Sequence, residues 1–189
     1  MSDAQATRRR LLDAATVEFA TYGIAGARVD RIAADAKVNK AQMYAYYGSK
    51  DGLFDAVFAE HVDAIVNAVP LVGTDLPGYA TRLYDAYLER PEIVRLSTWA
   101  RLERTPTGDL FAHRADQDKD KLQTIADAQR SGHIDPSLAP VDVHALVIAM
   151  AMTWSPASII YAASRNDDAT VHARRRRALF ESVRRAFHP

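Results

Sequence analysis

Apolar residues recur at intervals of three and four along almost the whole chain, and the alternation typical of strands is nearly absent. The first example is the series Leu11, Ala15, Phe19 and Tyr22, which would lie along one side of a helix that ends at Gly23. Clusters of turn-forming residues divide the rest of the chain into further segments of helical length. We therefore predict an all-α fold of about nine helices.

The first four predicted helices precede the best linker in the chain. They are expected over residues 11–22, 29–36, 40–47 and 50–69. The stretch 70–78, P-L-V-G-T-D-L-P-G, follows them and is rich in turn formers. We predict a small N-terminal domain over residues 1–49 and a larger helical domain over residues 50–189, with the helix 50–69 linking the two.

Charge is distributed unevenly, although the chain as a whole has a formal net charge of zero. Residues 1–50 hold eight basic and five acidic side chains, a net charge of +3, and the remaining residues carry the compensating −3. A basic N-terminal part on an acidic body suits contact with phosphate groups at one end of the molecule.

Several classes of site are excluded by composition. The chain has no cysteine, which excludes disulfides, thiolate zinc sites and a cysteine nucleophile, and fits a reducing compartment. The six histidines lack the helical spacing of a two-ligand metal site, so we predict neither a metal nor a cofactor. The basic run 8–10 is not followed by the apolar segment of a signal peptide, and we expect a cytoplasmic protein.

One uncharged stretch, residues 145–163, approaches the length that spans a bilayer. Thr153, Ser155 and Pro156 interrupt it, and no second segment of this kind exists. We interpret it as part of a helix buried in a core or an interface, and expect no membrane partner.

Residues 28–47 predict two short helices joined by a tight turn at residues 37–39. The apolar positions that would meet inside are Val29, Ile32, Ala33, Ala36, Val38, Met43 and Tyr47. Asn39 is placed to cap the second helix, whose outward residues would be Lys40, Ala41, Gln42, Tyr44, Ala45 and Tyr46. This is the layout of a helix-turn-helix, and the outward side chains suit phosphates and base edges.

The run V-D-R-I-A-x-x-A-x-V-N-K-x-x-x-Y-x-Y-Y-x-S-K-x-x-L resembles the N-terminal signature of the TetR family of repressors, and the match covers about residues 8–58. The resemblance implies that Lys40, Tyr44, Tyr46 and Lys50 contact the DNA backbone or groove, with Ala41 and Gln42 nearest the base edges. Two positions depart from the family. Lys37 stands where glycine is usual at the turn, and Arg28 replaces the usual Thr or Ser, so that it can contact a phosphate but cannot cap the helix in the same way.

The resemblance also implies a body that binds a small molecule and forms a homodimer through its last two helices, expected at about 140–163 and 171–187. Such a protein would repress transcription from a palindromic operator and be released by a small apolar or aromatic effector. Large side chains at helical spacing are the pocket candidates, namely Tyr84, Tyr87, Trp99, Leu102, Met150 and Trp154, together with Phe111 and Tyr161.

Two other classes of function remain as alternatives. A DNA-binding regulator or architectural protein without a ligand would share the same N-terminal pattern. An enzyme is disfavoured because the sequence has no glycine-rich phosphate loop, nucleophile elbow or paired catalytic carboxylates. Asp116, Asp118 and Asp120 alternate as in a calcium loop, but Lys121 stands where such a loop needs glycine.

Overall fold

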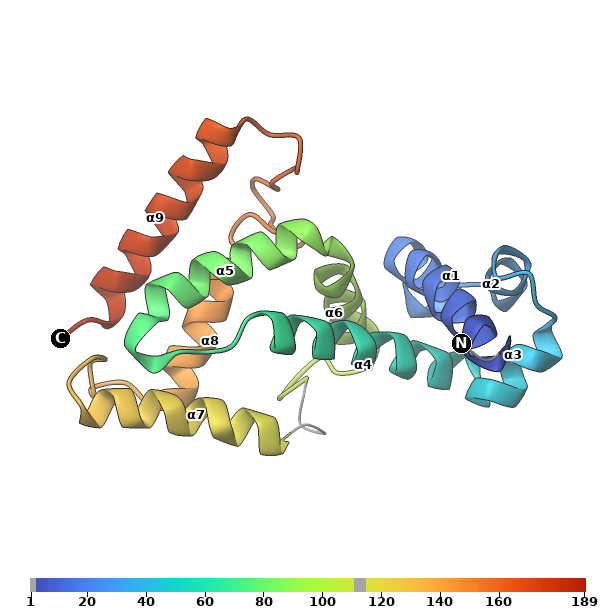
Figure 1. Ribbon diagram of the computed structural model, residues 1–189, viewed down its shortest axis with the longest axis horizontal. Coiled ribbons are helices and arrows are strands. Elements are labelled where there is room, and N and C mark those ends of the chain that lie inside the picture. Colours follow the sequence, from blue (N-terminus) through green and yellow to red (C-terminus); the bar gives the residue numbers. More distant parts are fainter. Residues whose placement is uncertain (1–2, 111–114) are drawn as a thin grey trace. The chain divides into compact units, whose positions relative to one another are not determined.

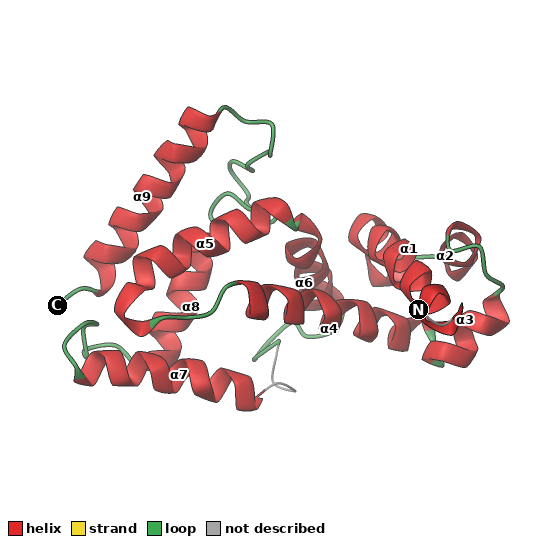
Figure 2. Ribbon diagram, in the orientation of Figure 1, coloured by secondary structure: helices red, strands yellow, loops and turns green. Residues whose placement is uncertain are grey.

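The computed structural model describes residues 3–110 and 115–189. Within these ranges the chain forms nine α-helices and one short 3₁₀ helix, and it contains no strand (Figures 1 and 2). The predicted all-α fold is therefore confirmed. Phe111, one of the pocket candidates, lies outside the described residues.

Two compact units make up the chain, and the first is formed by two separate stretches of sequence. It comprises the chain up to Ala64 together with Glu92–Leu110. Its helices are α1 (Asp3–Gly26), α2 (Val29–Asp35), α3 (Lys40–Tyr47), most of α4 (Lys50–Ala68) and α6 (Pro91–Glu103).

The core of this first unit is aromatic and aliphatic. Phe19 of α1 meets Phe54 of α4 edge to face, with ring centroids 5.2 Å apart, and Leu11, Ile32 and Met43 are fully buried. Gly23 has a φ of 74°, which makes a kink in α1 before the helical turn that ends at Gly26. The predicted break at Gly23 is confirmed. Glycine suits this position because a positive φ costs it little free energy.

Helix α6 packs against the end of α1 in the same unit. The Arg95 guanidinium donates to the carbonyl of Ala20 (Nε–O 2.7 Å), and the Ala25 N–H donates to Glu103 (N–Oε2 2.7 Å). The Trp99 indole lies against Gly23, where an added Cβ would meet its ring at 2.9 Å. This close approach is a second reason for glycine at position 23.

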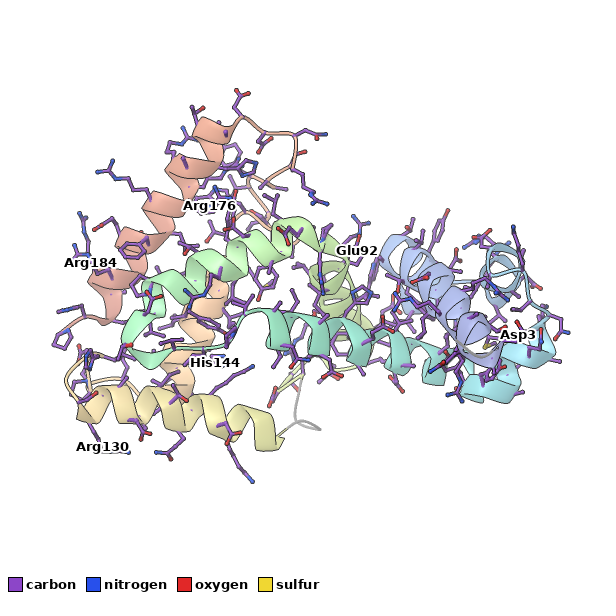
Figure 3. All side chains as sticks on the ribbon, viewed as in Figure 1. Asp3, Glu92, Arg130, His144, Arg176 and Arg184 are labelled. Carbon is purple, nitrogen blue, oxygen red and sulfur yellow. The ribbon has the colours of Figure 1, made fainter. Side chains whose placement is uncertain are left out.

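The second unit comprises Ile65–Pro91 and the chain after Leu110. It contains η1 (Gly73–Asp75), α5 (Leu76–Glu89), α7 (Ala115–Arg130), α8 (Pro140–Ala151) and α9 (Ala169–Phe187). Helix α5 packs against α8 and α9, and α7 packs against α8 and η1. Arg176 of α9, labelled in Figure 3, pairs with Asp85 of α5 (Nε–Oδ1 2.8 Å).

The predicted linker and the helix expected over 140–163 both need correction. Asp75 caps α5 by accepting from the Gly78 N–H (Oδ1–N 2.9 Å), so the linker is shorter than residues 70–78. Helix α8 ends at Ala151, and turns follow up to α9. Pro156 has no N–H for the Met152 carbonyl. The Ser155 N–H instead donates to that carbonyl (N–O 2.9 Å), which closes a turn of four residues.

Among the described residues, no single helix is both long enough and apolar enough to cross a membrane. Two helices separated by a break, Lys50–Ala68 and Gly73–Glu89, meet the requirements of length and composition only jointly.

Candidate nucleic-acid interface

The turn between α2 and α3 is tight and is made by a lysine. Lys37 has a φ of 55°, and it is the only residue other than glycine with a positive φ in the described part of the chain. The Val38 N–H donates to the carbonyl of Ala33 (N–O 3.0 Å), which closes the turn. Ala33 and Ala36 are buried, so the two helices approach closely at small side chains. The turn is where the sequence predicts it, despite the missing glycine.

A reciprocal capping box fixes the start of α3. The Gln42 N–H donates to Asn39 (N–Oδ1 2.8 Å), and the Asn39 N–H donates to the Gln42 side chain (N–Oε1 3.3 Å). The predicted cap at Asn39 is confirmed, and Gln42 has a role that its outward position did not indicate. Its carboxamide oxygen is held at the helix start while its Nε2 group takes no part in the box.

The outer face of α3 carries most of the predicted DNA-contacting side chains. Lys40, Ala41, Gln42 and Tyr44 are exposed, whereas Tyr46 is half-buried and Met43 is fully buried. The Arg8 guanidinium lies 5.1 Å from the centroid of the Tyr46 ring. Lys40 forms an ion pair with Asp30, whose hydrogen bond raises the pKa of the lysine. The helix thus presents an ammonium, an amide and a phenol on one exposed face.

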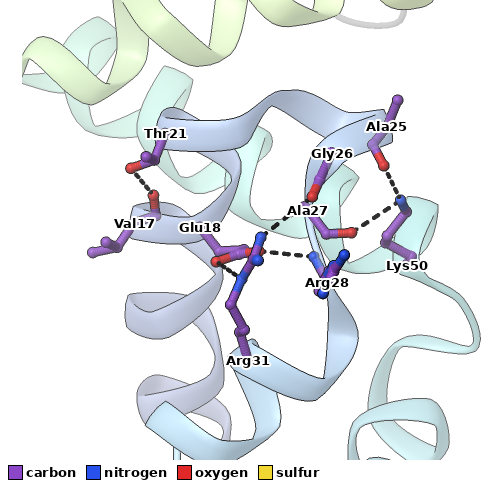
Figure 4. A network of polar contacts seen from close by, with 9 residues as sticks. All are labelled: Val17, Glu18, Thr21, Ala25, Gly26, Ala27, Arg28, Arg31 and Lys50. Carbon is purple, nitrogen blue, oxygen red and sulfur yellow. Dashed lines mark hydrogen bonds and ion pairs between the residues drawn. The ribbon is translucent and has the colours of Figure 1, made fainter.

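A buried carboxylate replaces the side-chain cap that α2 lacks. Arg28 stands at the N-cap position and makes no cap with its side chain, but its N–H donates to Glu18 of α1 (N–Oε1 2.8 Å; Figure 4). The Arg31 guanidinium reaches the same carboxylate (Nη2–Oε1 2.5 Å). Glu18 therefore joins α1 to the first turn of α2.

Glu18 was missed by reasoning from the sequence. Its side chain is only 5% exposed, although it is charged. Burial acts to raise its pKa, but the hydrogen bonds from Arg31 and from the Arg28 N–H outweigh burial and hold the pKa below its usual value. The available signal was an acidic residue inside an apolar stripe, next to Phe19, with an arginine 13 positions later.

Lys50 is the first residue of α4, and Arg28 directly precedes α2. The Lys50 ammonium donates to the carbonyls of Ala25 (Nζ–O 3.1 Å) and Ala27 (Nζ–O 3.2 Å), which ties α4 to the loop before α2 (Figure 4). An ammonium has three N–H groups, so one remains for a further acceptor such as a phosphate oxygen. The Arg28 side chain is exposed.

A separate cavity of about 400 Å³ lies within the second unit. Its walls come from α5, the first residue of α6, the end of α8 and the segment after α8, namely Tyr84, Tyr87, Leu88, Pro91, Ala151, Trp154, Ser155, Pro156, Ala163, Ser164, Arg165 and Asn166. Three pocket candidates, Tyr84, Tyr87 and Trp154, are among them. Behind this wall, the Tyr84 hydroxyl lies 2.6 Å from Nδ1 of the buried His172.

The other pocket candidates lie elsewhere. Trp99 and Leu102 belong to α6 in the first unit, where Trp99 packs on Gly23 and Leu102 is exposed. Met150 of α8 does not line the cavity, and Tyr161 is also exposed. Helical spacing alone therefore grouped side chains that the fold separates.

Both parts of the chain match known protein families. Residues 11–57 match the model of bacterial regulatory proteins of the tetR family, and residues 75–185 match the Tetracyclin repressor-like C-terminal domain. The HTH-type transcriptional repressor SCO4008 of Streptomyces coelicolor is 39% identical over 155 residues, which are 81% of this chain and 80% of the relative. The chain belongs to the TetR family. It is thus a DNA-binding transcriptional regulator, with α2 and α3 as its helix-turn-helix.

Solved structures of other proteins share the fold. SCO4942 of Streptomyces coelicolor is 45% identical, with a TM-score of 0.81 over 96% of this chain and 98% of the other. AibR, crystallised in complex with isovaleryl coenzyme A and operator DNA, is 15% identical, with a TM-score of 0.67 over 94% of this chain and 97% of its own. At that identity, the likeness to AibR is one of fold.

Proposed function

We propose that this TetR-family protein is a cytoplasmic repressor that binds a palindromic operator as a homodimer and leaves the DNA when a small effector binds. The proposed DNA-binding domain is residues 1–49, and the regulatory domain is residues 50–189, with α4 linking them. The observation that carries the proposal is the exposed face of α3, held in place by the Asn39 capping box and the Glu18 network. A rigid, exposed helix in this motif suits the major groove.

Each predicted DNA-contacting residue has a proposed role. Ala41 and Gln42 face base edges, where a methyl group suits thymine and the Gln42 Nε2 group can donate to an acceptor. Tyr44 and Tyr46 donate hydroxyl hydrogen bonds to the backbone. Arg28, Lys40 and Lys50 supply positive charge for phosphates.

Selection of binding sites from a random duplex pool tests the proposal. We expect a palindromic site, and Gln42→Ala should change the preferred bases while leaving the salt dependence of binding intact. Lys50→Gln keeps a donor for the Ala25 and Ala27 carbonyls but removes the charge, so it should weaken binding to all sequences alike. The slope of log affinity against log salt is negative, and its magnitude should decrease by about 1 for each phosphate that the variant no longer neutralises. No enriched site, or two variants that bind as the unaltered protein does, would contradict the assignment.

Homodimerisation is proposed through α8 and α9. Exposed apolar side chains on these helices, Val141, Leu146 and Phe180, support it because large apolar groups on neighbouring helices favour association. The proposed surface consists of α8 and α9 alone, because the chain after Ala151 does not extend α8.

Replacing Leu146 with glutamate should separate the subunits, because a charge would have to be buried at the interface. We expect the sedimentation velocity of the variant to be that of a monomer and its operator affinity to fall at least tenfold. Glu181→Gln, an exchange on α9 outside the apolar set, serves as the control and should leave the dimer intact. A dimer that survives Leu146→Glu at micromolar concentration would place the interface elsewhere.

The effector is proposed to act through its differential affinity for two conformations of the dimer. The 400 Å³ cavity supports a ligand-responsive regulator over a ligand-independent one, because its volume and aromatic walls are those of a small-molecule site. We propose no catalytic activity.

A further inference from the structure

The lining of the cavity in the second unit combines two kinds of side chain. Aromatic and apolar side chains, including Tyr84, Tyr87 and Trp154, form most of its wall. Tyr84 and Trp154 meet edge to face, with ring centroids 5.9 Å apart, so together they offer ring faces in two orientations. Most of its other polar residues are consecutive, residues 164–166, Ser-Arg-Asn. A ligand that fills the cavity therefore needs a ring or an apolar body and a polar group at one side.

The polar part of the lining carries a positive charge that is exposed to solvent. Arg165 is the one charged residue among the twelve that line the cavity, and none of the twelve is acidic. Arg165 is exposed, and its guanidinium forms no ion pair or hydrogen bond with any residue in the ranges 3–110 and 115–189.

The nearby acid that could neutralise Arg165 is already engaged. Asp167 pairs with Arg175 (Oδ2–Nη1 2.5 Å) and accepts from the Ser164 N–H (Oδ2–N 3.2 Å). The hydrogen bond from Arg175 holds the pKa of Asp167 below its usual value, so this acid stays charged and bound to Arg175. Asp167 therefore does not pair with Arg165, whose guanidinium is available to an anionic ligand.

Arg175 lies beside the cavity, next to the lining residue Trp154, although it does not itself line the cavity. It lies 6.0 Å from the centroid of the Trp154 ring, and its Nε–H is buried without a hydrogen-bond partner. The guanidinium groups of Arg165 and Arg175 can thus both donate to an acceptor on a ligand.

We infer that the effector is a compact aromatic carboxylate, whose ring lies against Trp154 and Tyr84 and whose carboxylate pairs with Arg165. The inference rests on the proposed ligand-responsive function and specifies its ligand class. A carboxylate matches the planar fork of a guanidinium and accepts from several donors at once. The volume of about 400 Å³ is at the small end of ligand sites, which favours one or two rings over a larger molecule.

Calorimetric titration of the full-length protein with matched acids and amides tests the inference. The probes are benzoate, cinnamate and indole-3-acetate, each compared with its neutral primary amide, and acetate as an anion without a ring. Each aromatic acid should bind about tenfold or more tightly than its amide, because the amide cannot form a charge-assisted pair. Acetate should bind more weakly than every aromatic acid.

Two arginine variants test whether Arg165 supplies the charge that binds the carboxylate. Arg165→Gln should lower the affinity for the aromatic acids about tenfold, to the level of the amides, and leave the affinity for the amides unchanged. Arg174→Gln removes an exposed arginine of α9 that does not line the cavity, and it should change neither. Equal binding of acids and amides, unchanged binding to Arg165→Gln, or no saturable binding of any aromatic acid would each overturn the inference.

Operator binding separates this inference from the proposed function. Release of operator DNA by a neutral aromatic compound that fills the cavity would sustain the ligand-responsive function and refute the carboxylate. Aromatic acids that bind through Arg165 without changing operator affinity would sustain the ligand class and refute the proposed release.

Discussion

Phe54→Ala is expected to destabilise the first unit by about 3–5 kcal/mol and to abolish operator binding. The Phe54 ring is fully buried and joins three elements. It meets Phe19 of α1 edge to face, stacks on Phe58 within α4, and lies under the Arg104 guanidinium, 4.6 Å from its centroid. Removing it leaves a cavity where the helix-turn-helix meets its support, and the surrounding helices can fill that space only in part.

Thermal unfolding followed by circular dichroism and operator binding followed by fluorescence anisotropy measure these effects. Leu102→Ala is the matched control, because this apolar side chain belongs to the same unit but is 68% exposed. The control should change stability by less than about 0.5 kcal/mol. The cavity belongs to the other unit, so binding of aromatic acids should survive Phe54→Ala at temperatures where the second unit is folded. An unchanged melting temperature would refute the role given to this ring.

Glu18→Ala is expected to cost about 2 kcal/mol, since it leaves the Arg28 N–H at the start of α2 without its acceptor. Operator affinity should fall as well, because Glu18 positions α2 against α1. Glu18→Gln keeps an acceptor oxygen and loses the charge, so it should be less harmful than the alanine variant. Asp13→Asn, which alters the exposed Arg9–Asp13 pair, should cost about 1 kcal/mol or less.

The contribution of Glu18 should depend on pH in a defined direction. Its pKa in the folded protein is lowered from the usual value of 4.5, so the unfolded chain binds the proton more readily. The stabilisation is therefore fully present above about pH 4.5 and is lost as the pH falls through the lowered pKa. Urea unfolding should show that the difference between the unaltered protein and Glu18→Gln shrinks between pH 7 and pH 3. A difference that grows on acidification would contradict the network.

The helix-turn-helix could be predicted almost completely from the sequence. Local signals define it: Asn39 with Gln42 three residues later gives the cap, and the buried positions of α2 and α3 follow helical spacing. The turn at Lys37 was expected although glycine is absent there, and it has the left-handed conformation. Whether its exposed residues contact DNA stays a prediction.

The ligand cavity could be predicted only in part. Tyr84 and Tyr87 share one face of α5, and Trp154 follows α8, so spacing found a true cluster. The same reasoning included Trp99 and Leu102, because periodicity identifies a buried face but not the element that covers it. It also overlooked Arg165, since nothing in the neighbouring sequence distinguishes a lone arginine in a turn-rich segment from any other surface arginine.

Sequence alone determined the features that depend on neighbours along the chain: the helices and most of their ends, the turn at Lys37, the cap at Asn39 and the family. Only the tertiary structure decided which distant segments meet. It placed α6 with the helix-turn-helix, buried Glu18 under the start of α2, and engaged Lys50 with two carbonyls. The physical reason is that helix propensity and capping act within a few residues, whereas burial and ion pairing join residues of any separation in the chain. For the helix-turn-helix, the short-range sequence pattern specified α3, and long-range contacts specified how the motif is held in place.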